Sequence, residues 1–225
     1  MVFAAVLGTV YAVIRWGNLN TNRHSARLFS WGALKILGIK LRLKGEEYLE
    51  GSQPCVYVAN HQSALDVATF GAIYPSRTLV IGKKELLWLP FFGLYFIAAG
   101  NILINRQKRV KAILNLSHAV KAVQNRLASI WIFPEGTRSR GKVELLPFKK
   151  GAFMLAIQAG VPLVPIVCAP LETLMDGKTR KFRKGTLTIQ ILPPIQTHPR
   201  QLEDLDLLIQ EVREKMLKAI HGLKA

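Results

Sequence analysis

The sequence predicts an α/β fold in which helices flank a largely parallel central sheet, preceded by an N-terminal unit of two helices. Short apolar runs, each with the length of a buried strand, alternate with helical patterns along most of the chain. This alternation is typical of parallel strands joined by crossover helices. The first 43 residues have the spacing of two helices instead, so we place a boundary between residues 1–43 and an α/β domain at 44–225.

Composition restricts the possible partners. The chain has 225 residues, of which half are apolar, and this favours one compact domain with a full core over disorder. It carries 31 basic and 14 acidic residues, a formal net charge of +17. Such a charge indicates an anionic partner: nucleic acid, an acidic membrane surface, an acidic carrier protein or a phosphorylated substrate.

The N-terminal unit predicts contact with a membrane surface. The apolar run Val2 to Ile14 has 13 residues, short of the roughly 20 that span a bilayer. The next segment, from Ser25 to Leu43, has helical spacing, and its basic stripe, which lies on the same side as Trp31, consists of Arg27, Lys35 and Arg42. We interpret residues 1–43 as an interfacial anchor in one leaflet. A buried helical pair is the alternative.

The α/β domain divides into strands and helices as follows. The strand-like runs lie at 55–59, 78–82, 101–105, 129–133, 163–168 and 186–192. The helical patterns lie at 64–73, 108–127, 149–159 and 203–223, the last with a single apolar stripe that predicts core packing. Residues 86–99 are nearly all apolar, which fits either a buried helix or a face that contacts lipid or an acyl chain. The cysteines, Cys55 and Cys168, are expected to be buried free thiols.

The heptapeptide from Asn60 to Asp66 follows a buried strand, where α/β folds usually place their chemistry. His61 lies in the turn before the next helix, and Asp66 lies one turn into that helix. The chain can fold back so that the carboxylate accepts from one imidazole nitrogen and leaves the other free to take a proton. The alternative is that Ser63 and Asp66 form a capping box and His61 is a loop histidine.

Basic residues follow three other strand-like runs. In Phe133-Pro-Glu-Gly-Thr-Arg, Gly136 permits a tight turn, and Arg138 has the planar fork that suits a phosphate. Glu135 can orient an arginine or bind near the acceptor hydroxyl, or serve only in the turn. Arg106 heads a basic cluster at a helix start, where a bound phosphate would relieve the conflict with the helix dipole. Lys83 is a weaker candidate for the same anion pocket.

Four motifs in order resemble the blocks of the glycerolipid acyltransferase superfamily, most closely the bacterial 1-acyl-sn-glycerol-3-phosphate acyltransferases. The motifs cover residues 60 to 165 and are Asn60-His-x-Ser-x-x-Asp66, Gly100-x-Ile-x-Ile-x-Arg106, Phe133-Pro-Glu-Gly-Thr-Arg-Ser139 and Val161-Pro-x-Val-Pro165. The sequence departs from the family at Asn105, where many members carry an acidic residue. By this resemblance Arg106, Glu135 and Arg138 map onto acceptor-binding blocks, and a two-helix membrane anchor precedes the catalytic domain.

The resemblance implies acyl transfer from a thioester to the sn-2 hydroxyl of lysophosphatidic acid, which gives phosphatidic acid. His61 would be the general base, Asp66 would orient it, and Ser63 as a covalent nucleophile is the second choice. No metal or cofactor is expected, because acyl carrier protein or acyl-coenzyme A supplies the acyl group as a co-substrate. The enzyme would be monotopic on an anionic phospholipid membrane, at the cytoplasmic face of the inner or plasma membrane.

Other functions stay open at this point. Glycerol 3-phosphate or another lysophospholipid is an alternative acceptor, and a non-catalytic lipid-binding protein would keep the same fold. A nucleic-acid-binding module fits the net charge alone, but the sequence has no base-reading motif and no aromatic stacking platform. We therefore expect no nucleic-acid partner.

Overall fold

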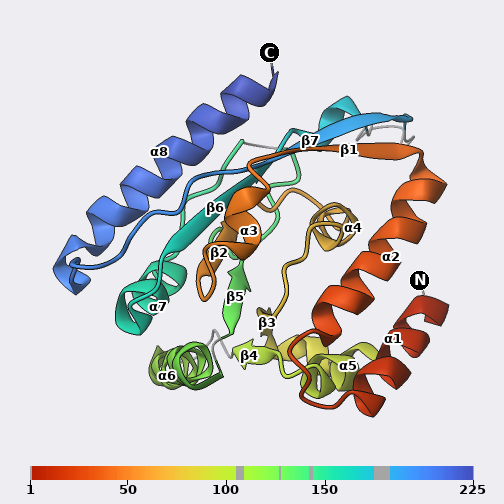
Figure 1. Ribbon diagram of the computed structural model, residues 1–225, viewed down its shortest axis with the longest axis horizontal. Helices are drawn as coiled ribbons and strands as arrows, with labels where there is room; N and C mark the ends of the chain where they lie inside the picture. Colours follow the sequence, from red (N-terminus) through yellow and green to blue (C-terminus); the bar gives the residue numbers. More distant parts are fainter. Residues whose placement is uncertain (1, 105–108, 127, 142–143, 175–182, 225) are drawn as a thin grey trace.

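The computed structural model describes residues 2–104, 109–126, 128–141, 144–174 and 183–224. Within them the chain forms a seven-stranded sheet of order β1-β7-β6-β2-β5-β3-β4 (Figure 1). The five strands from β6 to β4 run parallel to one another, whereas β7 is antiparallel to β6 and β1 is parallel to β7. The predicted α/β fold with a largely parallel sheet is therefore confirmed.

The central strands are buried on both faces, as their continuous apolar runs predict. In β2 every residue is buried, and neighbouring side chains enter different cores. Val56 and Val58 pack on one face, whereas Tyr57 and Ala59 pack on the other. The strands are β1 (Ile39–Lys44), β2 (Val56–Ala59), β3 (Thr78–Lys83), β4 (Ile102–Ile104), β5 (Ser129–Ile132), β6 (Leu163–Cys168) and β7 (Gly185–Ile191).

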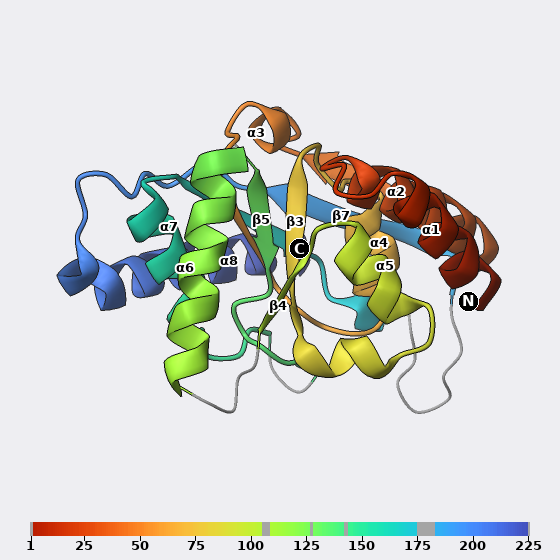
Figure 2. The ribbon, with the colours of Figure 1, turned by 90° about the horizontal axis from the view of Figure 1, so that it is seen from below.

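Helices cover both faces of the sheet (Figure 2). One face packs against α6 (Arg109–Arg126), α7 (Gly151–Ala159) and α8 (Leu205–Lys224). The opposite face packs against α2 (Thr21–Leu37), α3 (Glu47–Glu50) and α4 (Asp66–Gly71). The predicted apolar stripe of the C-terminal helix is confirmed as core, with Leu208, Val212 and Met216 fully buried. Both cysteines are buried free thiols, as expected.

The predicted C-terminal end of the second helix, at Leu43, is wrong. Helix α2 stops at Leu37, where Gly38 adopts a left-handed conformation with φ 66° and its N–H donates to the carbonyls of Leu34 and Lys35. The following residues, Ile39–Lys44, pair with β7 instead. Arg42 therefore lies on a strand, not on a helical basic stripe. The alternation of apolar and basic residues in Ile-Lys-Leu-Arg-Leu-Lys has the period of a strand.

Helix α2 packs directly on α4. The Ser30 hydroxyl donates to the carbonyl of Ala68, and Arg27 Nε donates to the carbonyl of Tyr74 at 3.2 Å. A side chain at Gly71 would place its Cβ only 2.9 Å from the carbonyl oxygen of Ala26. The two helices therefore approach as closely as a glycine permits.

Helix α1 (Val2–Ile14) lies beside α5 (Phe92–Ala98), and a 3₁₀ helix, η1 (Lys84–Trp88), precedes α5 (Figure 1). Among the described helices, none has the length and apolar content required to cross a bilayer. The prediction of a buried helix over residues 86–99 holds only in part, since Phe96 is buried but Trp88 is 84% exposed.

Candidate active site

His61 lies at the edge of the sheet where the parallel strands end, directly after β2 and Asn60. The loop after β5 runs beside it, because the N–H of Ser139 donates to the carbonyl of His61 at 2.8 Å and the N–H of Arg140 donates to that of Gln62 at 3.1 Å. These two hydrogen bonds bring together the first and third sequence motifs. The predicted site residues of both motifs therefore share one edge.

The predicted contact between His61 and Asp66 is present. His61 Nδ1 lies 2.6 Å from Asp66 Oδ2. The same carboxylate oxygen accepts from the N–H groups of Gln62 at 2.7 Å and Ser63 at 3.1 Å. Because a carboxylate accepts hydrogen bonds and donates none, Nδ1 of His61 carries the proton and Nε2 is left as the acceptor. The Asp66 side chain is fully buried, which keeps water from competing for these hydrogen bonds.

The capping interpretation is also correct in part. Asp66 accepts the N–H of Ser63, as the acidic member of a capping box does. Ser63 Oγ accepts the N–H of Leu65 at 2.9 Å and not that of Asp66. One carboxylate thus holds the turn and orients the ring, so the two interpretations are not exclusive.

The ring of His61 is held by an aromatic neighbour that sequence reasoning missed. It stacks on Phe133 with ring centroids 4.1 Å apart and planes 17° apart. Phe133 follows β5, so it reaches His61 from the neighbouring strand. The imidazole remains 18% exposed. Its orientation is therefore fixed on two sides while part of the ring still faces solvent.

Two amides join the turn that carries His61 to the end of β6, and neither was assigned a role from the sequence. Asn60 Oδ1 accepts the N–H of Cys168 at 2.9 Å, and its amide nitrogen donates back to the carbonyl of Cys168 at 3.1 Å. Gln62 donates to Cys168 and Ala169 and accepts the N–H of Leu171 at 3.0 Å. Burial raises the pKa of the Cys168 thiol, so this neighbour is no thiolate nucleophile.

Glu135 is a buried acid, only 3% exposed, whose carboxylate joins two loops. Its Oε1 accepts the N–H of His61 at 2.6 Å, and its Oε2 accepts the N–H of Leu146 at 2.9 Å. Burial raises the pKa of Glu135, and the two backbone donors oppose that shift. These contacts indicate that Glu135 positions the turn that carries His61. The acceptor-binding role expected from the resemblance stays a prediction.

The other predicted acceptor-binding residues differ in how the structure places them. Gly136 has φ 70°, the left-handed conformation that the tight turn requires. Arg138 is exposed, and within the described ranges its guanidinium makes no ion pair or hydrogen bond. Lys83 is exposed at the end of β3, beside Ile104 of β4. Arg106 lies outside the described residues.

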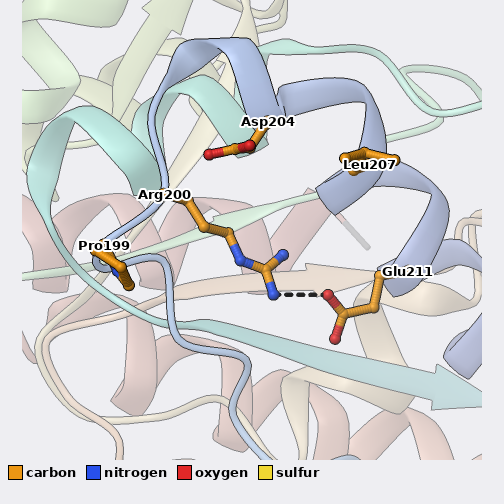
Figure 3. Close-up of a pocket in the computed structure, with 5 residues that line it drawn as sticks. All are labelled: Pro199, Arg200, Asp204, Leu207 and Glu211. Atoms are coloured by element: carbon orange, nitrogen blue, oxygen red, sulfur yellow. Dashed lines mark ion pairs between the residues drawn. The ribbon is translucent and has the colours of Figure 1, made fainter.

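Two shallow cavities lie away from this edge. One, of about 310 Å³, is lined by Pro199, Arg200, Asp204, Leu207 and Glu211 (Figure 3). Arg200 and Glu211 form an ion pair across it at 2.8 Å. The other, of about 380 Å³, is lined by residues that precede β2 and β6, at the opposite edge of the sheet from His61. Among the described residues, no group of three histidine, cysteine or acidic side chains is arranged to hold a metal.

Comparison with known proteins places these features in a family. Residues 40–169 match the family described as Acyltransferase. The chain is 36% identical over 217 residues to 1-acyl-sn-glycerol-3-phosphate acyltransferase alpha of Bos taurus, covering 96% of this chain and 75% of that one. It is 36% identical over 194 residues to the 1-acyl-sn-glycerol-3-phosphate acyltransferase of Escherichia coli, covering 86% and 78%.

A solved structure is similar over almost the whole chain. The 1-acyl-sn-glycerophosphate (LPA) acyltransferase PlsC from Thermotoga maritima superposes with a TM-score of 0.74 at 25% sequence identity. The superposition covers 92% of this chain and 81% of PlsC. The sheet and the helices that carry the site are therefore shared with that enzyme.

The raised pKa of Glu135 predicts a pH-dependent contribution to stability. Over the range from the usual carboxyl pKa of 4.5 toward neutrality, the folded protein holds this proton more tightly than the unfolded chain does. The free energy of unfolding should therefore fall as pH rises through this range. We expect Glu135→Gln to remove this contribution, so that the stability of the wild type relative to the variant declines with pH in chemical denaturation.

Glu46→Gln is the matched control, because Glu46 is an exposed glutamate directly before α3 and lies outside the two loops that Glu135 joins. The difference in free energy of unfolding between Glu46→Gln and the wild type should not change with pH. If the free energy of unfolding of the wild type minus that of Glu135→Gln stays constant or grows with pH, burial does not dominate the pKa of Glu135.

Proposed function

This chain belongs to the Acyltransferase family, and from that premise we propose that it transfers a fatty acyl group from a thioester to the sn-2 hydroxyl of 1-acyl-sn-glycerol 3-phosphate. The product is phosphatidic acid. One observation carries the mechanism: the 2.6 Å contact between His61 Nδ1 and Asp66 Oδ2 leaves Nε2 as the free acceptor at the rim of the sheet. That nitrogen is where a general base would receive the hydroxyl proton.

The reaction begins with proton transfer to His61. Nε2 takes the proton of the acceptor hydroxyl as its oxygen attacks the thioester carbonyl, and Asp66 stabilises the imidazolium that forms. The tetrahedral intermediate then expels the thiolate, which takes the proton back from His61. The imidazole is regenerated, and an ester bond replaces the thioester bond. Acyl carrier protein or acyl-coenzyme A is the donor, and the reaction uses no further cofactor.

The oxyanion of the intermediate needs donors near the start of α4. In the described turn the N–H groups of Gln62 and Ser63 are engaged by Asp66, and that of Leu65 is engaged by Ser63 Oγ. The N–H of Ala64 makes none of these hydrogen bonds, and Ala64 is exposed. We assign that N–H to the oxyanion, for which such a donor is typically worth about 3–4 kcal/mol of transition-state stabilisation.

The acceptor phosphate would bind Arg138, together with Arg106 and Lys83. Arg138 is supported by its exposed guanidinium and by the hydrogen bonds that hold its loop against His61. A guanidinium forms two parallel hydrogen bonds with a phosphate, which would fix the distance from the phosphate to the reacting hydroxyl. Positioning of this kind lowers the barrier by removing a loss of entropy from the reaction step.

The N-terminal helices would hold the enzyme on the cytoplasmic face of an anionic membrane, as a monotopic protein. On α2, Leu28, Trp31 and Ile36 are 69%, 65% and 86% exposed. Lys35 Nζ lies 5.1 Å from the centre of the Trp31 ring, so a cation accompanies the apolar side chains. Exposed apolar area beside basic side chains is typical of a helix that lies in a lipid surface. Because β1 joins the sheet, this unit would end at Gly38.

Substitutions in the catalytic turn test the role of His61. His61→Ala and Asp66→Asn should each lower kcat by about 10²- to 10⁴-fold, because the base or its orientation is lost. Ser63→Ala should stay near the wild-type rate, since Ser63 Oγ is used to cap the turn. Thiol release from acyl-coenzyme A in the presence of lysophosphatidic acid measures the rate, and circular dichroism checks the fold. Activity lost in Ser63→Ala but kept in His61→Ala would instead indicate a covalent serine.

The phosphate contact predicts a selective effect on one substrate. Arg138→Ala should raise the KM for lysophosphatidic acid by about ten- to a hundredfold, the size expected for one charge-assisted contact. The KM for the acyl donor should change little. Lys218→Ala on α8 removes an equal charge from a distant exposed position and should leave both values unchanged. An equal rise in both KM values for Arg138→Ala would contradict a phosphate site at this residue.

A further inference from the structure

The segment from η1 to α5 exposes an unusual amount of apolar surface. Trp88 is 84% exposed, and the four further apolar side chains that are about half exposed are Leu89, Phe91, Leu94 and Ile97. Gly93, Phe96 and Ala98 of α5 are buried instead. Single exposed apolar residues are common, but a run of this kind marks an interaction surface.

This outward arrangement is fixed by the backbone. Phe91 has φ 64° and ψ −42°, a positive-φ conformation that is rare for a bulky residue. Its carbonyl accepts from Thr9 Oγ1 at 2.8 Å, which ties the bend to α1. A Cβ on Gly93 would meet the carbonyl oxygen of Leu87 at 2.5 Å, so the turn closes too tightly for any other residue. The exposed rings therefore project from a rigid bend.

Helix α1 lies beside α5 and also exposes apolar side chains, and η1 begins directly after β3. The N–H of Gly17 donates to the carbonyl of Ala98 at 2.9 Å, and both views show α1 and α5 side by side (Figures 1 and 2). Among the side chains of α1 that the structure describes, the exposed apolar ones are Leu7, Val10, Val13 and Ile14. Lys83 is exposed at the end of β3, and Lys84 is exposed at the start of η1. Apolar area, an exposed tryptophan and cations thus meet beside the strand ends.

We infer that residues 84–97 are a second membrane contact, separate from α2, that seats the catalytic edge against an anionic phospholipid surface. The inference rests on the proposed function, because lysophosphatidic acid and its product are lipids that must pass between a bilayer and His61. Tryptophan favours the boundary between headgroups and acyl chains. Lysines beside it are attracted to anionic headgroups, as is a chain of net charge +17. Lipid is the occupant that matches the apolar side chains and the cations together.

Vesicle binding by the full chain tests this contact. The variant W88S/L94S should bind vesicles of phosphatidylcholine and phosphatidylglycerol about tenfold or more weakly than the wild type, because two apolar side chains no longer enter the lipid. Leu207→Ser is the matched control, since Leu207 is 69% exposed on α8 and should have no effect. W31S/I36S serves as the reference for the α2 contact. Cosedimentation gives the partition constant for each protein.

A label gives a second, direct readout. An environment-sensitive fluorophore on Trp88→Cys should be quenched by brominated acyl chains, whereas the same label on Leu207→Cys should not. Wild-type binding by W88S/L94S, or a label at position 88 that stays unquenched, would overturn the inference even where W31S/I36S loses binding. If W88S/L94S loses self-association in lipid-free buffer and still binds vesicles, the surface joins copies of this chain and the inference is wrong.

The enzyme assay separates this inference from the proposed function. With lysophosphatidic acid dispersed in detergent, W88S/L94S should turn over at a rate close to that of the wild type, because the membrane is no longer needed to deliver the acceptor. Absence of wild-type turnover under these conditions would contradict the proposed function, whatever the vesicle measurements give. A W88S/L94S variant that is equally defective in detergent and on vesicles would contradict the membrane contact alone.

Discussion

One oxygen of Asp66 determines the geometry of the candidate site. It accepts from the His61 ring and from the N–H groups of Gln62 and Ser63, all within 3.1 Å. The ring and the turn that carries it are therefore positioned by the same buried atom. Asn60 and Gln62 then fasten this turn to β6, while Glu135 holds it from the other side. A base held in this way needs little reorganisation when the proton moves.

Much of the fold and the central pair of the site followed from the sequence, for identifiable reasons. Strands β2 and β6 are predominantly apolar and buried along their whole length, which is the pattern of a strand covered on both faces. The five-residue spacing between His61 and Asp66 allows a turn to close on the first helical turn, and the structure closes it. The apolar stripe of α8 has no competing interpretation, because it is long and regular.

The features that were missed depend on tertiary contacts or on the backbone conformation of a single residue. Phe133 reads as the end of a strand, and nothing local shows that its ring stacks on His61. Glu135 belongs to a motif with an arginine, yet its partners are backbone N–H groups from distant loops. The end of α2 could have been found, since Gly38 followed by strict alternation signals a C-cap and a strand. The exposure of Trp88 and the bend at Phe91 are features that no sequence period predicts.

The packing of α2 on α4 affects how this enzyme can be shortened or engineered. The Ser30 hydroxyl reaches the carbonyl of Ala68, two residues along the helix that begins with Asp66. Removing residues 1–38 to obtain a more tractable catalyst would therefore expose one side of α4, the helix that begins with Asp66. The outward side of α2 makes no such contact through Leu28 or Ile36. A redesign for solubility should replace the exposed apolar residues of that side with polar ones and keep the helix.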